Sequence, residues 1–277
     1  MKRRAAVLLT VLLCAAFFAP AARADMGPKP SLGIVCRNAP PGEAYIDLLV
    51  ETQPKNNQID PTGYNQTMLA AMRAHETDGW QLARITGTAI PIFGDIRCEV
   101  KDGEATVKFS YVGIPDRFKV IAATEDGRVT VSNVVERHAF ASVVYFDYAT
   151  GRAMEKSPVF QLAAQFLLLL GLTLLIEGVI LPLFGFDLRR NWKPFLAVNA
   201  GTQLTLNLIV AIVNLRGGML NAFLVYLLFE LVILTAEAIL YAKFLKQHSR
   251  MRRVTYAIVA NTASFAAGVI LMLRFKF

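Results

Sequence analysis

Residues 159–184 read VFQLAAQFLLLLGLTLLIEGVILPLF, an apolar run long enough to cross a membrane as one helix. Similar runs follow at 194–214, 219–243 and 254–273. A helix of about 20 apolar residues spans a hydrocarbon core of about 30 Å. We therefore expect an all-α four-helix transmembrane bundle over residues 158–277.

Polar side chains interrupt all four runs. Because a charge at the bilayer centre costs at least about 2.5 kcal/mol, these groups should face one another and not lipid. The expected intramembrane polar layer consists of Glu177, Asn199, Gln203, Asn207, Glu230, Glu237, Asn261 and Ser264. Counted along the helices from their basic ends, four of these residues fall about 9 to 14 Å deep. These four are Glu177, Gln203, Glu237 and Asn261.

Two interpretations of this layer stay open. In the first, protonated Glu and amide side chains hold the helices together, and each contact contributes about 0.5 to 2 kcal/mol. In the second, Glu230 and Glu237 bind or relay a proton or cation, and the Asn and Gln oxygens assist. Three carboxyl groups exceed what packing requires, yet no basic residue inside the predicted bundle is available to neutralise them.

The composition separates a membrane part from a soluble part. The chain is 55% hydrophobic with a mean hydropathy of +0.43, more apolar than a soluble domain of this length. Its formal charge of +8 is uneven, because residues 25–158 carry 14 Lys/Arg and 17 Asp/Glu whereas residues 159–277 carry 11 and 4. The mildly acidic soluble part argues against nucleic acid as a partner.

Residues 1–24 have the form of a cleaved signal peptide. A basic start at 2–4 precedes a short apolar run at 5–19, and a small-residue cleavage site ends at Ala24. The run is short for a membrane span, which disfavours the alternative of an uncleaved anchor helix. We therefore expect the domain that follows, residues 25–157, outside the cytoplasm.

The charges of the predicted loops agree with this orientation, since Lys and Arg favour the cytoplasmic side of a membrane. The short outer loop at 215–218 holds only Arg216. The two predicted inner loops hold Arg189, Arg190, Lys193, Lys243, Lys246, Arg250, Arg252 and Arg253. We therefore expect both the N-terminal domain and the C-terminus to be extracytoplasmic.

The 25–157 domain reads mostly as strands, rich in Ile, Leu and Val or alternating in polarity between Gly, Pro and Asp-Gly turns. The predicted strands cover 31–37, 43–51, 95–100, 104–111, 118–124, 128–135 and 138–148, with one helix at about 65–76. The Asp-Gly pairs at 102–103 and 126–127 suit type I′ turns, in which both central residues take positive φ. We expect an extracytoplasmic β-sandwich-like domain of six to eight strands with one helix.

Two cysteines remain once the signal is removed, Cys36 and Cys98, both on predicted strands. An exported domain favours a disulfide between them. The alternative is two buried free thiols, because cysteine is common in protein cores.

A search for catalytic motifs returns none. The chain lacks Gly-x-Ser-x-Gly and His-Glu-x-x-His, and its histidines, His75, His138 and His248, are too scattered for a metal set. His138 reads as an ordinary strand residue. We therefore expect a protein that is not an enzyme, with no catalytic residues, metal or cofactor.

Several motifs carry a resemblance to a known family. They are DMGPKPS at 25–31, ERHAF at 136–140, and the membrane segments 199–207, 230–241 and 260–268. They resemble a functionally uncharacterised family of bacterial membrane proteins, common in Gram-positive anaerobes, with a signal peptide, a β-rich exported domain and four C-terminal transmembrane helices. The resemblance implies that architecture and a bacterial plasma-membrane location, and it transfers no activity.

These observations lead to three functional hypotheses. The first is a non-enzymatic sensing, binding or transport-accessory unit, with the lipid bilayer and an envelope small molecule, ion or protein as partners. The second is a small proton- or cation-coupled transporter that uses the Glu, Asn and Gln layer. The third, an intramembrane enzyme, has no nucleophile and base pair in the sequence to support it.

Overall fold

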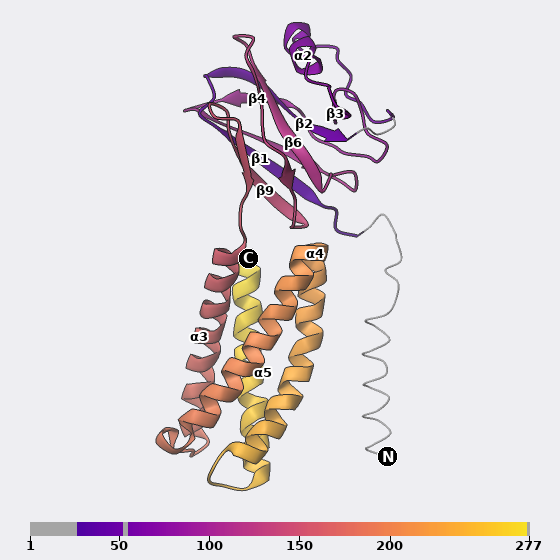
Figure 1. The fold of residues 1–277 in the computed structure, drawn as a ribbon. Helices are drawn as coiled ribbons and strands as arrows, with labels where there is room; N and C mark the ends of the chain where they lie inside the picture. Colours follow the sequence, from indigo (N-terminus) through magenta and orange to yellow (C-terminus); the bar gives the residue numbers. More distant parts are fainter. Residues whose placement is uncertain (1–26, 52–54, 276–277) are drawn as a thin grey trace.

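The computed structural model describes residues 27–51 and 55–275, with side chains up to residue 271. The predicted signal peptide, 1–24, lies outside the described residues. The chain forms a β-rich region followed by three long helices, and the β-rich region sits at one end of these helices (Figure 1).

Ten strands and one short helix make up the β-rich region within the described residues. They are β1 (Ser31–Arg37), β2 (Gly42–Glu51), α2 (Gln66–Arg73), β3 (Trp80–Leu82), β4 (Arg97–Val100), β5 (Glu104–Ser110), β6 (Arg117–Thr124), β7 (Val129–Val131), β8 (Val135–Glu136), β9 (Ala141–Asp147) and β10 (Arg152–Glu155). One sheet has the order β10-β9-β1-β5, and the other has the order β3-β2-β6-β7 with β4 on β2 and β8 on β6. Buried side chains of both sheets and of α2 form one hydrophobic core.

Most predicted strands are present, but the predicted strand 128–135 is divided into β7 and β8. The hydroxyl of Ser132 accepts a hydrogen bond from the N–H of Val120 at 2.8 Å. Asn133 then turns its side chain away, toward Ala153. The N–H of Ser132 still donates to the carbonyl of Val120, but the Ser132 hydroxyl has replaced its carbonyl as the acceptor, and the strand ends there. The short strands β3 and β10 were not predicted.

The two Asp-Gly turns differ. Asp102 and Gly103 both have positive φ, 51° and 78°, as a type I′ turn requires. In the second pair only Gly127 has a positive φ, so the type I′ prediction is wrong there. The Asp126 carboxylate accepts hydrogen bonds from Thr124 Oγ1 at 2.6 Å and from Arg128, and these bonds hold Asp126 in a different turn.

The two cysteines are free thiols, which corrects the expected disulfide. Cys36 is 1% exposed on β1. Cys98 lies on β4, in the other sheet, and its Sγ donates to the backbone carbonyl of Ala44 at 3.3 Å. Burial raises the pKa of both thiols to about 12. The two side chains behave as core residues, with the second thiol directed at a neighbouring strand.

Three helices follow the β-rich region: α3 (Val159–Leu183), α4 (Leu188–Phe244) and α5 (Arg250–Phe275). All three are long and apolar enough to cross a membrane. The expected runs 194–214 and 219–243 both fall in α4, so the structure has three long apolar helices where four were expected. The two runs follow each other with only a sharp kink at Gly218 between them, and no separate loop divides them.

Gly218 is the one residue of α4 outside helical geometry, with φ 79° and ψ 174°. Glycine adopts this φ without the steric cost that other residues pay. We call the segments on either side α4a (188–217) and α4b (219–244). They lie against each other, since Asn199 Nδ2 is 2.6 Å from Tyr241 OH, and Figure 1 shows α4 running toward the β-rich region and back.

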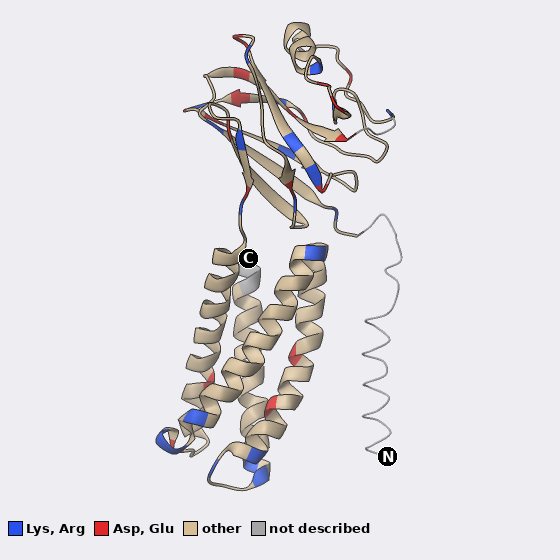
Figure 2. Ribbon diagram, viewed as in Figure 1, with Lys and Arg blue, Asp and Glu red and all other residues tan. Residues whose placement is uncertain are grey.

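The opposite end of the helices is closed by hydrogen bonds between two loops. Gln247 Oε1 accepts from Asp187 N at 3.0 Å and from Asn191 Nδ2 at 3.1 Å. Asn191 Oδ1 accepts from Lys246 N at 2.7 Å. Several Lys and Arg residues lie at this end of the helices, remote from the β-rich region (Figure 2). The loop between α3 and α4 and the loop between α4 and α5 are therefore bonded to each other.

Candidate functional site

The polar side chains of the helices meet in the apolar interior. Glu177 of α3 and Glu237 of α4b are both 0% exposed. Glu237 Oε1 lies 2.5 Å from Thr202 Oγ1 of α4a. Glu237 Oε2 accepts a hydrogen bond from Asn261 Nδ2 of α5. One carboxyl group therefore joins α4a, α4b and α5.

Glu177 connects α3 to α5. Its Oε1 accepts a hydrogen bond from Ser264 Oγ at 3.0 Å, and Tyr256 OH donates to its backbone carbonyl at 3.3 Å. The second carboxyl oxygen, Glu177 Oε2, has no hydrogen-bond partner in the described part of the chain. A buried oxygen left without a partner costs about 1 to 3 kcal/mol. A proton or a bound cation at Glu177 Oε2 would therefore be stabilised, because no hydrogen-bond donor of the described residues reaches this oxygen.

Asn199 of α4a presents the same situation. Its Nδ2 donates to Phe195 O at 3.1 Å and to Tyr241 OH at 2.6 Å, whereas its Oδ1 has no partner among the described residues. The Asn199 side chain also interacts with the carboxyl group of Glu177. Two acceptor oxygens in one buried cluster therefore lack a donor. A proton or a small cation is the kind of species that would satisfy them.

Hydroxyl hydrogens are also too few for this cluster. Thr202 Oγ1 lies 2.9 Å from a carbonyl of its own helix and 2.5 Å from Glu237 Oε1. Ser264 Oγ lies 3.1 Å from a carbonyl of its own helix and 3.0 Å from Glu177 Oε1. Each hydroxyl has one hydrogen and cannot donate to both oxygens. Hydrogens on the two carboxyl groups would supply what is missing.

Three of the predicted polar residues lie apart from this cluster. Gln203 is buried, and its carbonyl accepts from Asn207 Nδ2 at 2.9 Å within the same helix. Glu230 is 8% exposed and interacts with Tyr226, one turn earlier. Sequence reasoning placed Gln203 beside the carboxyl groups, but Thr202 occupies that position, because adjacent residues of a helix point about 100° apart. A threonine three residues after Asn199 was the signal that was missed.

The cluster consists of oxygen groups. Glu177 and Glu237 influence each other electrostatically, Glu230 acts on them from outside the cluster, and hydroxyl and amide groups complete their surroundings. Among the described residues, no group of three or more His, Cys, Asp and Glu side chains is arranged to hold a metal ion. Oxygen groups of this kind suit a proton or a hard cation better than a transition metal.

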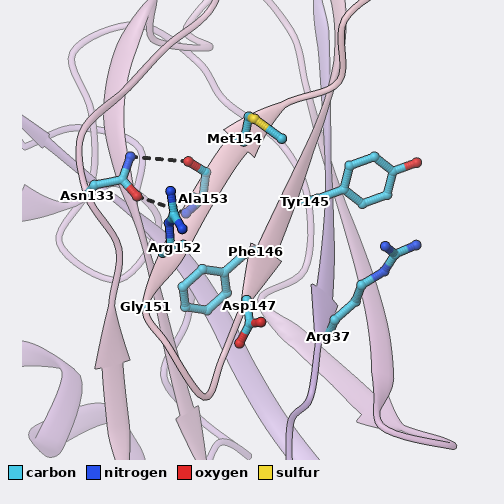
Figure 3. Close-up of a pocket in the computed structure, with 9 residues that line it drawn as sticks. All are labelled: Arg37, Asn133, Tyr145, Phe146, Asp147, Gly151, Arg152, Ala153 and Met154. Atoms are coloured by element: carbon cyan, nitrogen blue, oxygen red, sulfur yellow. Dashed lines mark hydrogen bonds between the residues drawn. The ribbon is translucent and has the colours of Figure 1, made fainter.

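A second candidate site is a pocket of about 720 Å³ on the β-rich region (Figure 3). The guanidinium of Arg37 lies over the ring of Tyr145, 4.5 Å from its centre. Across the pocket, the side-chain amide of Asn133 accepts from Ala153 N at 2.9 Å and donates to Ala153 O at 3.1 Å. Asn133 thus occupies the free edge of β10 as another strand would.

Charged groups of both signs line this pocket. Arg37 pairs with Glu104 at 2.9 Å, whereas Arg152, which also lines the pocket, has no acidic partner among the described residues. The N–H of Thr150 donates to the Asp147 carboxylate and lowers its pKa. An exposed cation, an anion and an aromatic ring suit a small anionic or zwitterionic ligand.

His138, Ser142 and Glu155 come together beside the helices. Ser142 Oγ donates to Glu155 Oε1 at 2.5 Å, and His138 Nδ1 lies 3.0 Å from Glu155 Oε2. Burial acts to raise the pKa of Glu155, but the hydrogen bonds from Ser142, His138 and Ala139 outweigh it and lower that pKa. The hydroxyl bonds the carboxylate and not the imidazole, so the three groups do not form the nucleophile and base arrangement of a hydrolase.

The fold and the buried cluster define a class of protein: a β-rich region joined to three long apolar helices whose character suggests membrane association. No family model, curated protein or solved structure matches the chain. The family resemblance of the sequence motifs therefore stays a prediction.

Proposed function

We propose that the chain is an integral membrane protein with an exported β-sandwich-like domain. Ligand binding to this domain changes the conformation of a membrane bundle. In this proposal α3, α4a, α4b and α5 make four crossings, with the basic loops in the cytoplasm and the β domain in the cell envelope. The protein acts as a non-enzymatic sensing or transport-accessory unit. The two sheets around one core support the sandwich, and the break at Gly218 supports a reversal of α4.

The observation that carries this proposal is the contact between Phe140 and the Gly218 break. The N–H of Phe140 donates to the backbone carbonyl of Leu215 at 2.7 Å. The Phe140 ring lies so close to Gly218 that a Cβ there would be 2.8 Å from it. A segment of the β domain therefore bears on the one non-helical residue of α4, where a change in backbone angle costs least.

Two charged residues hold the segment that carries Phe140. Arg137 donates to Ala139 O at 2.8 Å and pairs with Asp116 at 2.6 Å. Glu155, at the end of β10, accepts from the N–H groups of His138 and Ala139. The pocket of Figure 3 lies on the same β10 strand, which gives a ligand there a direct structural route to Phe140.

The test is ligand-dependent unfolding of the full chain in lipid nanodiscs. We expect at least one member of a panel of envelope metabolites, including D-alanine, inorganic phosphate and muramyl peptides, to raise the unfolding temperature. The shift should disappear in Arg152→Gln and persist in Lys55→Gln, an exposed lysine outside the pocket. No shift with any member, or an equal shift in Arg152→Gln, would count against a ligand site there.

Coupling to the helices is tested separately by hydrogen exchange. Phe140→Ala should speed amide exchange across 211–222, because it removes the ring that covers Gly218. Phe160→Ala is the matched control, since Phe160 is 86% exposed on α3. If amide exchange across 211–222 is unchanged in Phe140→Ala, the Phe140 contact does not couple the β domain to the helices.

A second function, proton or cation transport, is favoured by the unpartnered oxygens Glu177 Oε2 and Asn199 Oδ1. Reconstituted liposomes that carry the wild type should then pass protons or Na⁺ down a gradient, and Glu177→Gln and Glu237→Gln should stop this flux while keeping the protein folded. Glu99→Gln, on the surface of the β domain, is the control. Wild-type flux equal to that of protein-free liposomes would mean that the cluster only holds the helices together and does not transport.

A further inference from the structure

An apolar groove of about 690 Å³ runs along the outside of the helices between α4a and α4b. Small residues form one wall: Ala197, Gly201 and Thr205 follow one another at every fourth position and are exposed. A Cβ built on Gly201 would meet nothing within 4 Å. The groove therefore exists because side-chain volume is missing on α4a, and no residue of the described chain fills it.

The groove extends over about one leaflet of a bilayer. Lys193 lines one end of it and Thr205 the other. Twelve residues of helix separate them, about 18 Å at helical rise, against about 15 Å for half of a hydrocarbon core. The groove thus matches the depth to which a lipid tail reaches from one membrane surface.

The end of the groove at the helix termini is positively charged. Lys193 of α4a contributes to the lining, and so does Phe244 of α4b, whose ring lies under the ammonium group of Lys243 at 5.2 Å. Among the described residues neither Lys193 nor Lys243 has an acidic partner. Two cations thus lie where the headgroup of a lipid in the groove would be.

We propose that this groove binds one anionic membrane phospholipid, with an acyl chain along Ala197, Gly201 and Thr205 and the phosphate at Lys193. An acyl chain restores the packing contacts that an empty groove forfeits. A lysine at the membrane surface attracts an anionic headgroup. A second copy of the chain fits the same groove less well, because two copies would bring their Lys193 and Lys243 side chains together.

The site lies next to the buried carboxyl cluster. Thr202 lines the groove, and its hydroxyl is the group 2.5 Å from Glu237 Oε1. A bound acyl chain therefore covers the lipid-facing side of Thr202 and keeps water from Glu237. The inference requires that α4 lies in the bilayer, and it is independent of whether the β domain senses a ligand.

The experiment is native mass spectrometry of the full chain released from nanodiscs with equal amounts of phosphatidylglycerol and phosphatidylcholine. We expect retained phosphatidylglycerol to exceed phosphatidylcholine by about five-fold, the preference that one lysine near the surface confers. Lys193→Gln should abolish the preference, and Arg250→Gln, on α5 and outside the groove, should keep it.

A variant with a large side chain in the groove tests whether the acyl chain of the lipid binds there. Gly201→Leu should lower retained lipid of both kinds several-fold, whereas Gly171→Leu, at an equally open glycine of α3, should not. Folding of each variant is checked by circular dichroism and detergent gel filtration. Equal retention of both lipids by the wild type, full retention by Gly201→Leu, or a dimer that Gly201→Leu dissociates would each overturn the proposal.

Discussion

The side-chain amide of Asn261 on α5 donates a hydrogen bond to the carboxyl group of Glu237 on α4b, in the buried interior of the helices. Thr202 of α4a also contacts this carboxyl group, so the Glu237 side chain links α4a, α4b and α5. Glu237→Leu should therefore lower the free energy of unfolding by about 1 to 3 kcal/mol, since two buried polar groups lose their partner.

Glu237→Gln is the matched variant, because a Gln side chain has the same shape and can both accept and donate. It should unfold within about 1 kcal/mol of the wild type. Thermal unfolding of both variants in the same detergent measures the difference. A Leu variant as stable as the wild type would show that the Glu237 contacts do not hold the helices together.

Gly218→Ala should destabilise the junction between the β domain and the helices. Its φ of 79° disfavours any residue with a Cβ, and that Cβ would lie 2.8 Å from the Phe140 ring. We expect a loss of about 2 kcal/mol from both causes, measured as a lower unfolding temperature. Gly171→Ala, in an open helical position, should keep or slightly raise it. An unaffected Gly218→Ala would mean that Phe140 does not press on this residue.

The two cysteines of the β-rich region, Cys36 and Cys98, should resist thiol reagents while the protein is folded. Their pKa of about 12 lowers the thiolate fraction at pH 8 about a thousand-fold relative to the ordinary thiol pKa of 9, and burial also blocks access to Cys36. In a Cys14→Ser chain we expect no maleimide adduct by mass spectrometry before denaturation and two after it, without reductant. A denatured chain that takes up no maleimide until it is reduced would mean that Cys36 and Cys98 are bonded.

Asp47 should make the β domain less stable as the pH rises from about 4 to 6. Its side chain is fully buried, and it accepts hydrogen bonds from the N–H groups of Leu48, Arg84 and Ile85. Burial nevertheless raises its pKa from 3.8 to about 6. In this pH range the unfolded chain releases a proton that the folded chain keeps, so unfolding becomes easier by up to about 3 kcal/mol.

The measurement compares urea unfolding of the wild type with that of Asp47→Asn at pH 4, 5, 6 and 7. Other carboxylates titrate in both proteins and cancel in the difference. The advantage of the wild type over Asp47→Asn should be largest at pH 4 and should stop changing above pH 6. A difference that stays constant from pH 4 to 7 would place the pKa of Asp47 near its ordinary value.

Much of this architecture follows from short-range patterns. The apolar runs predict long helices because hydrophobic length alone decides whether a helix can cross a membrane, and three such helices are present. Alternation in 104–111 predicts β5, because a half-buried strand must alternate. The sequence likewise predicted one layer that contains Glu177, Glu237 and Asn261, since hydrocarbon excludes each of them singly, but it put Gln203 in that layer where the structure has Thr202.

Only the tertiary structure decided which side chains meet. Thr202, and not Gln203, reaches Glu237, because the rotation of α4a about its own axis is set by packing against α4b and α5. The Cys98 thiol points at Ala44 because β4 pairs with β2, a long-range choice that local patterns do not contain. The contact of Phe140 with Gly218 joins the β-rich region to α4, and no pattern in the sequence links these two residues. Contacts of this kind depend on the relative placement of whole elements, which periodicity along one chain does not encode.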